Sequence, residues 1–96
     1  MNLRQNLANA IKTVRKSRGL TQEDFGVVSS RTYLSSLERG LKSPTLDKLE
    51  KIANVLGVHP ATIVLLAYAQ QTEPVGRELL LKEITEELKT FWMNQS

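Results

Sequence analysis

Glycine and proline recur along this chain at short intervals, and they divide it into segments that only short helices can fill. Between these breaks, apolar residues return at steps of three and four, which is the spacing of one face of an α-helix. No segment shows the strict alternation that is typical of a half-buried strand. The sequence therefore predicts an all-α fold. The first helix is predicted from the apolar residues Leu3, Leu7, Ile11 and Val14.

The helix breakers and capping residues also predict where the next helices lie. Gly19 is expected to end the first helix in a left-handed conformation. Thr21 is expected to cap a short second helix, because Glu23 and Asp24 follow in its first turn. A third helix is expected over residues 30–39, with Leu34 and Leu37 turned inward and Gly40 at its end.

Two further helices are predicted in the middle of the chain. Ser43 or Thr45 is expected to cap a fourth helix, which ends at Gly57. Pro60 suits the first turn of a fifth helix, up to about residue 69, and His59 is expected to cap it. The fifth helix is apolar nearly all round, so it must be covered on more than one side. The fourth helix has its apolar face at Leu46, Leu49, Ile52, Ala53 and Leu56.

The last quarter of the chain is predicted to be a separate helix after a polar linker at residues 70–74. This helix, over about residues 75–93, repeats apolar residues at alternating steps of three and four, as a two-heptad stripe does. We expect a five-helix domain over residues 1–70 and a dimerisation element over residues 71–96. The expected dimer interface consists of Leu80, Leu81, Ile84, Leu88, Phe91 and Trp92.

The charges are distributed unevenly along the chain. Residues 1–45 contain eight Lys and Arg against three Asp and Glu (+5), and residues 46–96 contain five against seven (−2), which gives the overall +3. A basic half is what a nucleic-acid-binding surface requires, although solvated helix faces give the same pattern. There is no cysteine, which excludes disulfides and thiolate chemistry.

Three stretches of sequence, in order, resemble the phage-repressor and Cro type of helix-turn-helix family, often called Xre-like. They are L-T-Q-E-D-F-G, R-T-Y-L-S-S-L-E-R-G and S-P-T-L-D-K-L-E-K-I-A-N-V-L-G-V, within residues 7–69. The resemblance implies a transcriptional regulator, more often a repressor, that binds double-stranded DNA as a homodimer. Its recognition helix, about residues 30–39, would enter the major groove, with half-sites about one helical turn apart.

The resemblance also assigns roles to individual residues. Ser30, Arg31, Thr32 and Ser36 match positions that contact bases, and an Arg can bond guanine O6 and N7 together. The expected phosphate contacts, which carry no sequence information, are Thr21, Gln22, Tyr33, Arg39 and Lys42. Arg15 and Glu38 match a partly buried structural ion pair, and Gly26 matches a position that is small because two helices cross there.

The chain departs from the family pattern in one place. Gln22 and Gly40 are two residues closer together than the corresponding family positions, and the shortening falls within residues 26–30. Either the second helix is shorter by about half a turn, or the turn is rebuilt with serines. The angle of the recognition helix depends on which of these holds.

Other functions are less well supported. The single His has no second His or Cys to share a metal, and no glycine-rich phosphate loop follows a strand, so we expect no enzyme, metal or cofactor. No small-molecule ligand is suggested. Without a signal peptide or a membrane-spanning run, a cytoplasmic, nucleoid-associated protein of bacterial or phage origin is expected. The alternative is a protein-interaction module, such as an antitoxin or adaptor, that uses the fifth and last helices, with or without DNA binding.

Overall fold

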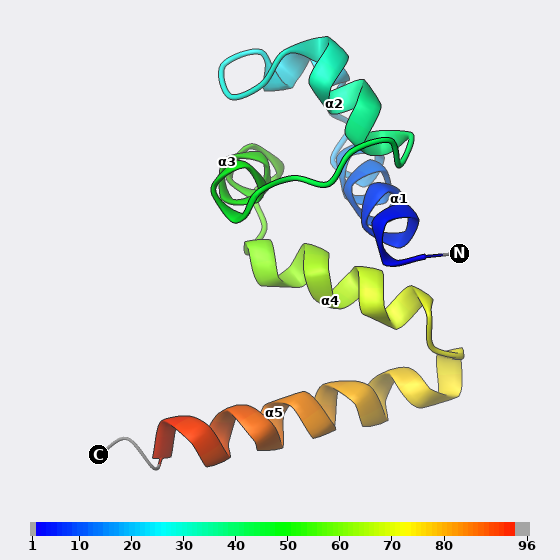
Figure 1. Ribbon diagram of the computed structural model, residues 1–96, viewed down its shortest axis with the longest axis vertical. Helices are drawn as coiled ribbons and strands as arrows, with labels where there is room; N and C mark the ends of the chain where they lie inside the picture. Colours follow the sequence, from blue (N-terminus) through cyan, green and yellow to red (C-terminus); the bar gives the residue numbers. More distant parts are fainter. Residues whose placement is uncertain (1, 94–96) are drawn as a thin grey trace.

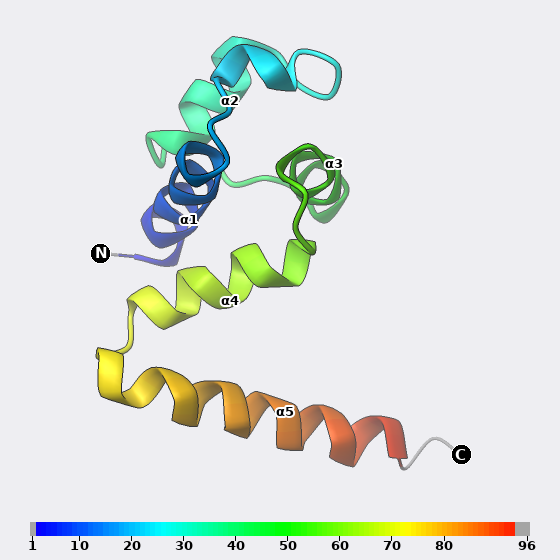
Figure 2. The same ribbon diagram turned by 180° about the vertical axis from the view of Figure 1, so that it is seen from behind.

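The computed structural model describes residues 2–93 and is helical throughout (Figures 1 and 2). No strand occurs within this range, so the all-α prediction is confirmed. In chain order the elements are α1 (Leu3–Ser17), the 3₁₀ turn η1 (Gln22–Phe25), α2 (Arg31–Glu38), α3 (Leu46–Leu56), α4 (Pro60–Gln70), the 3₁₀ turn η2 (Pro74–Gly76) and α5 (Arg77–Met93).

Helices α2, α3 and α4 each begin after a residue whose side chain caps them; the sequence predicted the caps of α3 and α4, but not Ser30. Ser30 caps α2, and its hydroxyl accepts a hydrogen bond from the Tyr33 N–H at 3.0 Å. Thr45, rather than Ser43, caps α3. The imidazole Nδ1 of His59 accepts from the first free N–H of α4 at 3.0 Å. Each cap satisfies a backbone donor that its helix leaves unpaired.

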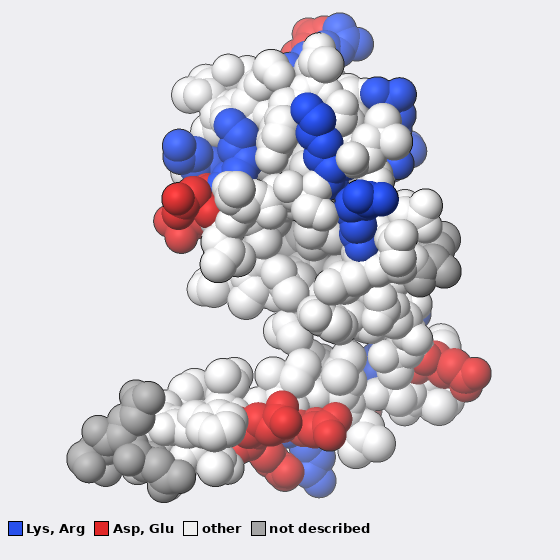
Figure 3. Space-filling view, in the orientation of Figure 1, with Lys and Arg blue, Asp and Glu red and all other residues white. Residues whose placement is uncertain are grey.

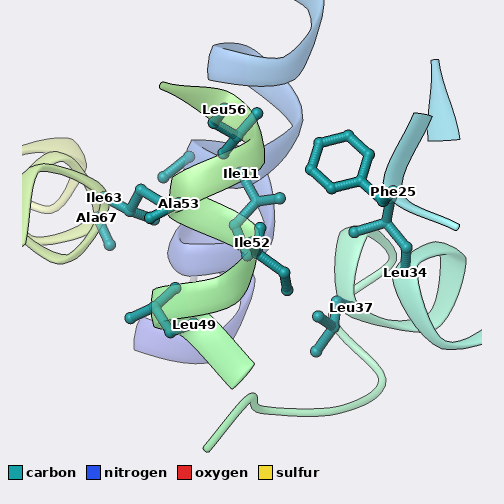
Figure 4. Packing of buried hydrophobic residues seen from close by; sticks show 11 residues of the cluster. Ile11, Phe25, Leu34, Leu37, Leu49, Ile52, Ala53, Leu56, Ile63 and Ala67 are labelled. Carbon is teal, nitrogen blue, oxygen red and sulfur yellow. The ribbon is translucent and has the colours of Figure 1, made fainter. Parts of the chain in front are cut away.

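The hydrophobic core lies where α1, α2, α3 and α4 meet (Figure 4). α1 packs chiefly on α4, and α3 closes the space between α4 and η1. Phe25 of η1 is fully buried, so even this four-residue turn is anchored in the core. The other large side chains with less than 2 % exposure are Ile11, Leu34, Leu37, Ile52, Leu56 and Ile63.

Several predicted details are wrong. The expected second helix is only a 3₁₀ turn, whereas α2, with Ser30 and Arg39 as its caps, lies within the expected residues 30–39. Leu46, expected in the core, is 82 % exposed because it lies at the start of α3, where it lines an open groove instead of the core. Gly26 is exposed, and a Cβ there would meet only the Glu23 carbonyl. It does not face α2, because the chain turns before the two elements cross.

α5 extends from this body as an arm. It turns back after α4 and lies on the far side of α4 from α1, α2 and α3 in both views (Figures 1 and 2). No residue of α5 is buried. The radius of gyration is 14.6 Å, whereas a compact domain of this length would have about 12.5 Å. The protein is therefore a packed body with an extended C-terminal helix.

No single helix within residues 2–93 is long and apolar enough to cross a membrane, and only α3 and α4 together, bent by 98°, meet the criteria of length and composition.

Candidate nucleic-acid interface

Three of the four residues expected to contact bases lie together at the start of α2. Ser30, Arg31 and Thr32 are all exposed. The Ser30 hydroxyl already accepts the Tyr33 N–H, so its remaining hydrogen-bonding capacity faces outward. The N-terminal end of α2 thus presents one guanidinium and two hydroxyls to solvent, a set that can bond base edges and phosphates.

Ser36 differs from these three. It lies one turn after Thr32, on the same side of the helix, but only 8 % of it is exposed. The chain folds back at the end of α2, where the Leu41 N–H donates to the Ser36 carbonyl at 3.0 Å. The short serine side chain does not reach past its surroundings, so the structure does not present Ser36 with the exposed base-contacting group.

Arg31 has a partner that the sequence did not predict. Its guanidinium Nη1 lies 3.2 Å from Oε1 of Glu23, which is part of η1, and both side chains are more than 70 % exposed. The pair connects the two halves of the motif across the surface. A solvent-exposed pair of this kind contributes little to stability. Its significance is that a carboxylate lies beside the main candidate for base recognition.

The expected phosphate contacts surround α2 on two sides. Thr21 is exposed, and its N–H donates to the Asp24 carboxylate at 2.7 Å, which fixes the start of η1. Arg39 and Lys42 are exposed beyond the other end of α2. Gly40 between them has φ +73°, and an added Cβ would meet the Gln5 side chain at 3.2 Å. The glycine allows this segment to lie close to α1.

Gln22 and the predicted ion pair form one buried network. Arg15 Nε and Nη2 donate to the two carboxylate oxygens of Glu38 at 2.7 and 2.9 Å, and Nη1 donates to the Leu20 carbonyl at 2.9 Å. The hydrogen bonds to Glu38 raise the pKa of the Arg15 guanidinium, while burial opposes the rise. Gln22 Nε2 donates to Glu38 Oε1 at 3.2 Å, so this predicted phosphate contact is half-buried and tied to the C-terminal end of α2.

Tyr33 is half-buried beneath two lysines. The Nζ atoms of Lys42 and Lys48 lie 5.6 and 5.2 Å from its ring centroid, within the range of cation–π attraction. Lys48 was not predicted as a site residue. The sequence held one signal, because a lysine in the first turn of a helix opposes the helix dipole and needs a compensating partner.

On the visible surface, basic side chains predominate over the body and acidic side chains gather on the arm, although each part also carries the opposite charge (Figure 3). Figure 3 shows Lys and Arg side chains over the body and a group of acidic side chains on α5. The basic residues near α2 are Arg31, Arg39, Lys42, Lys48 and Lys51. No group of three His, Cys, Asp or Glu that could hold a metal occurs within residues 2–93.

The residues expected to form a dimer interface leave a large apolar surface uncovered. Leu81, Leu88, Phe91 and Trp92 are between 49 and 68 % exposed, and Leu79 and Met93 add to them. Leu80 and Ile84 are half-buried. A groove of about 470 Å³ separates α5 from α3 and α4, and Figure 3 shows the notch between body and arm. Its apolar lining includes Leu46, Leu49, Val64, Leu65, Ile84 and Leu88.

Comparison with known proteins gives consistent results. A helix-turn-helix family model matches residues 11–63. An uncharacterized HTH-type transcriptional regulator of Sinorhizobium fredii is 39 % identical over 66 residues, which is 67 % of this chain and 86 % of that protein. The immunity repressor of Bacillus phage phi105 is 37 % identical over 76 % of this chain and 44 % of its own length. The control protein C.BamHI of Bacillus amyloliquefaciens is 35 % identical over 66 % and 82 %, respectively.

Solved structures show the same fold. The crystal structure of the clp gene regulator ClgR from Corynebacterium glutamicum superimposes with a TM-score of 0.67 at 30 % identity, over 72 % of this chain and 91 % of that chain. A second ClgR structure gives 0.69 over 93 % of each chain, at 24 % identity.

Proposed function

The chain belongs to the helix-turn-helix family of transcriptional regulators, and from this premise we propose that it is a sequence-specific repressor that binds double-stranded DNA as a homodimer. The observation that carries the proposal is the exposed group Ser30, Arg31 and Thr32 at the start of a short helix. α2 would enter the major groove by this end. The regulators it resembles are not enzymes, and they include a phage immunity repressor and a control protein.

The proposed contacts divide into base recognition and phosphate binding. Arg31 would bond a guanine through O6 and N7, and Ser30 and Thr32 would contact neighbouring base edges or phosphates. Thr21, Arg39 and Lys42 would bind phosphates and fix the register of the protein on the duplex. Gln22 and Tyr33 are half-buried and would contact DNA only through their exposed atoms. Ser36 would contact DNA only if the chain that follows α2 moved away from it.

The proposed dimer uses residues 71–96. Their apolar surface, together with the groove beside α3 and α4, has no cover within the described residues. A second copy of the chain would bury the α5 surface and the groove together, because in a two-fold dimer the same surface of each subunit faces the other. Dimerisation would then control occupancy of the operator through protein concentration, in the cytoplasm.

Selection of bound sequences from random duplexes tests the DNA-binding part directly. We expect a two-fold symmetric consensus with a guanine whose selection is lost in Arg31→Ala, while weak binding survives. If about six phosphates are neutralised, log affinity should fall with log salt at a slope near −5. A selection that returns no consensus, or a slope near zero, contradicts the proposal.

Sedimentation equilibrium of the chain, with and without residues 72–96, tests the dimer. The shorter protein should be monomeric and retain its helical melting transition, since none of residues 68–93 belongs to the core. A folded, shortened protein that still dimerises would show that the interface lies elsewhere.

The exposed surface of α5 also favours a second function, that of an interaction module that holds a different protein. Copurification from the native source distinguishes the two. A stoichiometric partner on a monomer of this chain supports the module, and a homodimer alone supports the repressor.

A further inference from the structure

The turn before α2, residues 26–30, is held by a lysine from another helix. The Lys48 Nζ donates to the Val28 carbonyl at 2.7 Å, and the same ammonium lies 5.2 Å from the Tyr33 ring centroid. Val28 belongs to the turn and Tyr33 to α2, so Lys48 of α3 contacts both. A charge-assisted hydrogen bond of this length is stronger than one between neutral groups.

The position of Lys48 is otherwise unfavourable for a cation. It lies in the first turn of α3, where its own N–H donates to the Thr45 cap at 3.2 Å. The helix dipole disfavours positive charge there. Lys48 is half-buried, whereas Lys42 and Lys51 are exposed. A cation in such a place requires compensation, and the Val28 carbonyl and the Tyr33 ring provide it.

Apart from the packing of Val28 against the core, the turn is fixed mainly by hydrogen bonds. The Phe25 carbonyl accepts both the Val28 and the Ser29 N–H, at 3.0 and 2.9 Å, and the buried Ser29 hydroxyl donates to the adjacent Ser30 carbonyl at 3.2 Å. All of these bonds are local. Among the hydrogen bonds of residues 2–93, the Lys48 bond is the one that joins this turn to a segment 20 residues away, and it links α3 to the start of α2.

We propose that Lys48 is a positioning residue that fixes the shortened turn and thereby sets the orientation of α2, so that Ser30, Arg31 and Thr32 meet the bases together. The proposal rests on the proposed DNA-binding function. The competing role for Lys48 is an ordinary phosphate contact, since it lines an open groove with Ser30 and Lys51.

Lys51 supplies a matched control. It lies one turn further along α3 and lines the same groove, and its side chain is exposed and makes no hydrogen bond or ring contact within residues 2–93. Lys48→Met removes the donor and the charge but keeps the aliphatic stem, Lys48→Arg keeps both donor and charge, and Lys51→Met removes the same charge from the control site.

The first measurement uses the free protein. Amide hydrogen exchange by NMR should speed up about tenfold at Tyr33 and Leu34 in Lys48→Met, because their N–H groups bond to Ser30 at the start of α2. Lys48→Arg and Lys51→Met should leave the exchange rates unchanged. Equal rates in all variants would overturn the proposal, whether or not the protein binds DNA.

The second measurement uses the full-length protein with its selected duplex and a random duplex. Lys48→Met should lose about tenfold in affinity for the selected duplex alone, with its salt slope unchanged, and Lys48→Arg should restore the affinity. Lys51→Met should weaken binding to both duplexes by the same factor and reduce the slope of log affinity against log salt by about 0.9. If Lys48→Met has the same effects as Lys51→Met, Lys48 is a phosphate contact. If the wild-type protein binds the selected duplex no more tightly than the random one, the proposed function fails. The hydrogen-exchange result still decides the role of Lys48.

Discussion

The body of the protein and its C-terminal helix contain the same kinds of residues but place them differently. In α3 the apolar positions Leu49, Ile52 and Leu56 are at most 4 % exposed. In α5 the equally regular positions Leu81 and Leu88 are both 49 % exposed. Apolar periodicity shows that a helix has a face to bury. It does not show whether the cover comes from the same chain.

This difference separates two sources of stability. The body buries its side chains within one chain and should keep its stability at any protein concentration. α5 contributes little until something covers it, so its contribution should depend on concentration. Variants in the two regions can therefore be compared by their free energies of unfolding. The expected losses of stability decrease from the buried ion pair to the surface.

Arg15→Met should produce the largest loss of stability. It leaves the Glu38 carboxylate, whose side chain is 3 % exposed, with Gln22 as its one side-chain partner among residues 2–93. Breaking a buried ion pair from one side costs about 3–5 kcal/mol. Urea unfolding monitored by circular dichroism measures the change in the free energy of unfolding. The double variant Arg15→Met/Glu38→Leu should recover much of the loss, and a single variant as stable as wild type would show that the pair is not buried in solution.

A matched pair of leucines tests the comparison between the regions themselves. Leu56→Ala removes a side chain that is 1 % exposed and should cost about 2–5 kcal/mol. Leu79→Ala removes one that is 67 % exposed and should change the free energy of unfolding by less than about 0.5 kcal/mol. The same urea experiment, at one low protein concentration, measures both. Equal losses would mean that α5 packs on its own body more closely than it does here.

The sequence predicted the parts of this structure that depend on local rules. The caps at Thr45 and His59 and the left-handed Gly19 follow from the immediate neighbours. The pairing of Arg15 with Glu38 came from the family resemblance, and both residues lie where the resemblance implied.

The parts that were missed depend on contacts between distant segments. The exposure of Leu46 and the burial of Ser36 depend on how α3 and the chain after α2 lie in space, which periodicity does not specify. The bond from Lys48 to Val28 exists because the shortened turn leaves a carbonyl facing α3. Glu23 was assigned only to a helix start, although its carboxylate also meets Arg31.

Glu23→Gln should have the smallest effect on stability and still change function. The pair with Arg31 is more than 70 % exposed on both sides, so its loss should change the free energy of unfolding by less than about 0.5 kcal/mol. On DNA the same carboxylate would lie near phosphates and compete with a base for the Arg31 guanidinium. Its removal should tighten binding to random duplex about threefold at low salt, an effect that salt screens. Fluorescence anisotropy with random and selected duplexes measures this, with Glu50→Gln on α3 as the control for lost negative charge. Unchanged binding by Glu23→Gln would place Arg31 and Glu23 away from the DNA, and this exposed pair would then contribute neither to stability nor to binding.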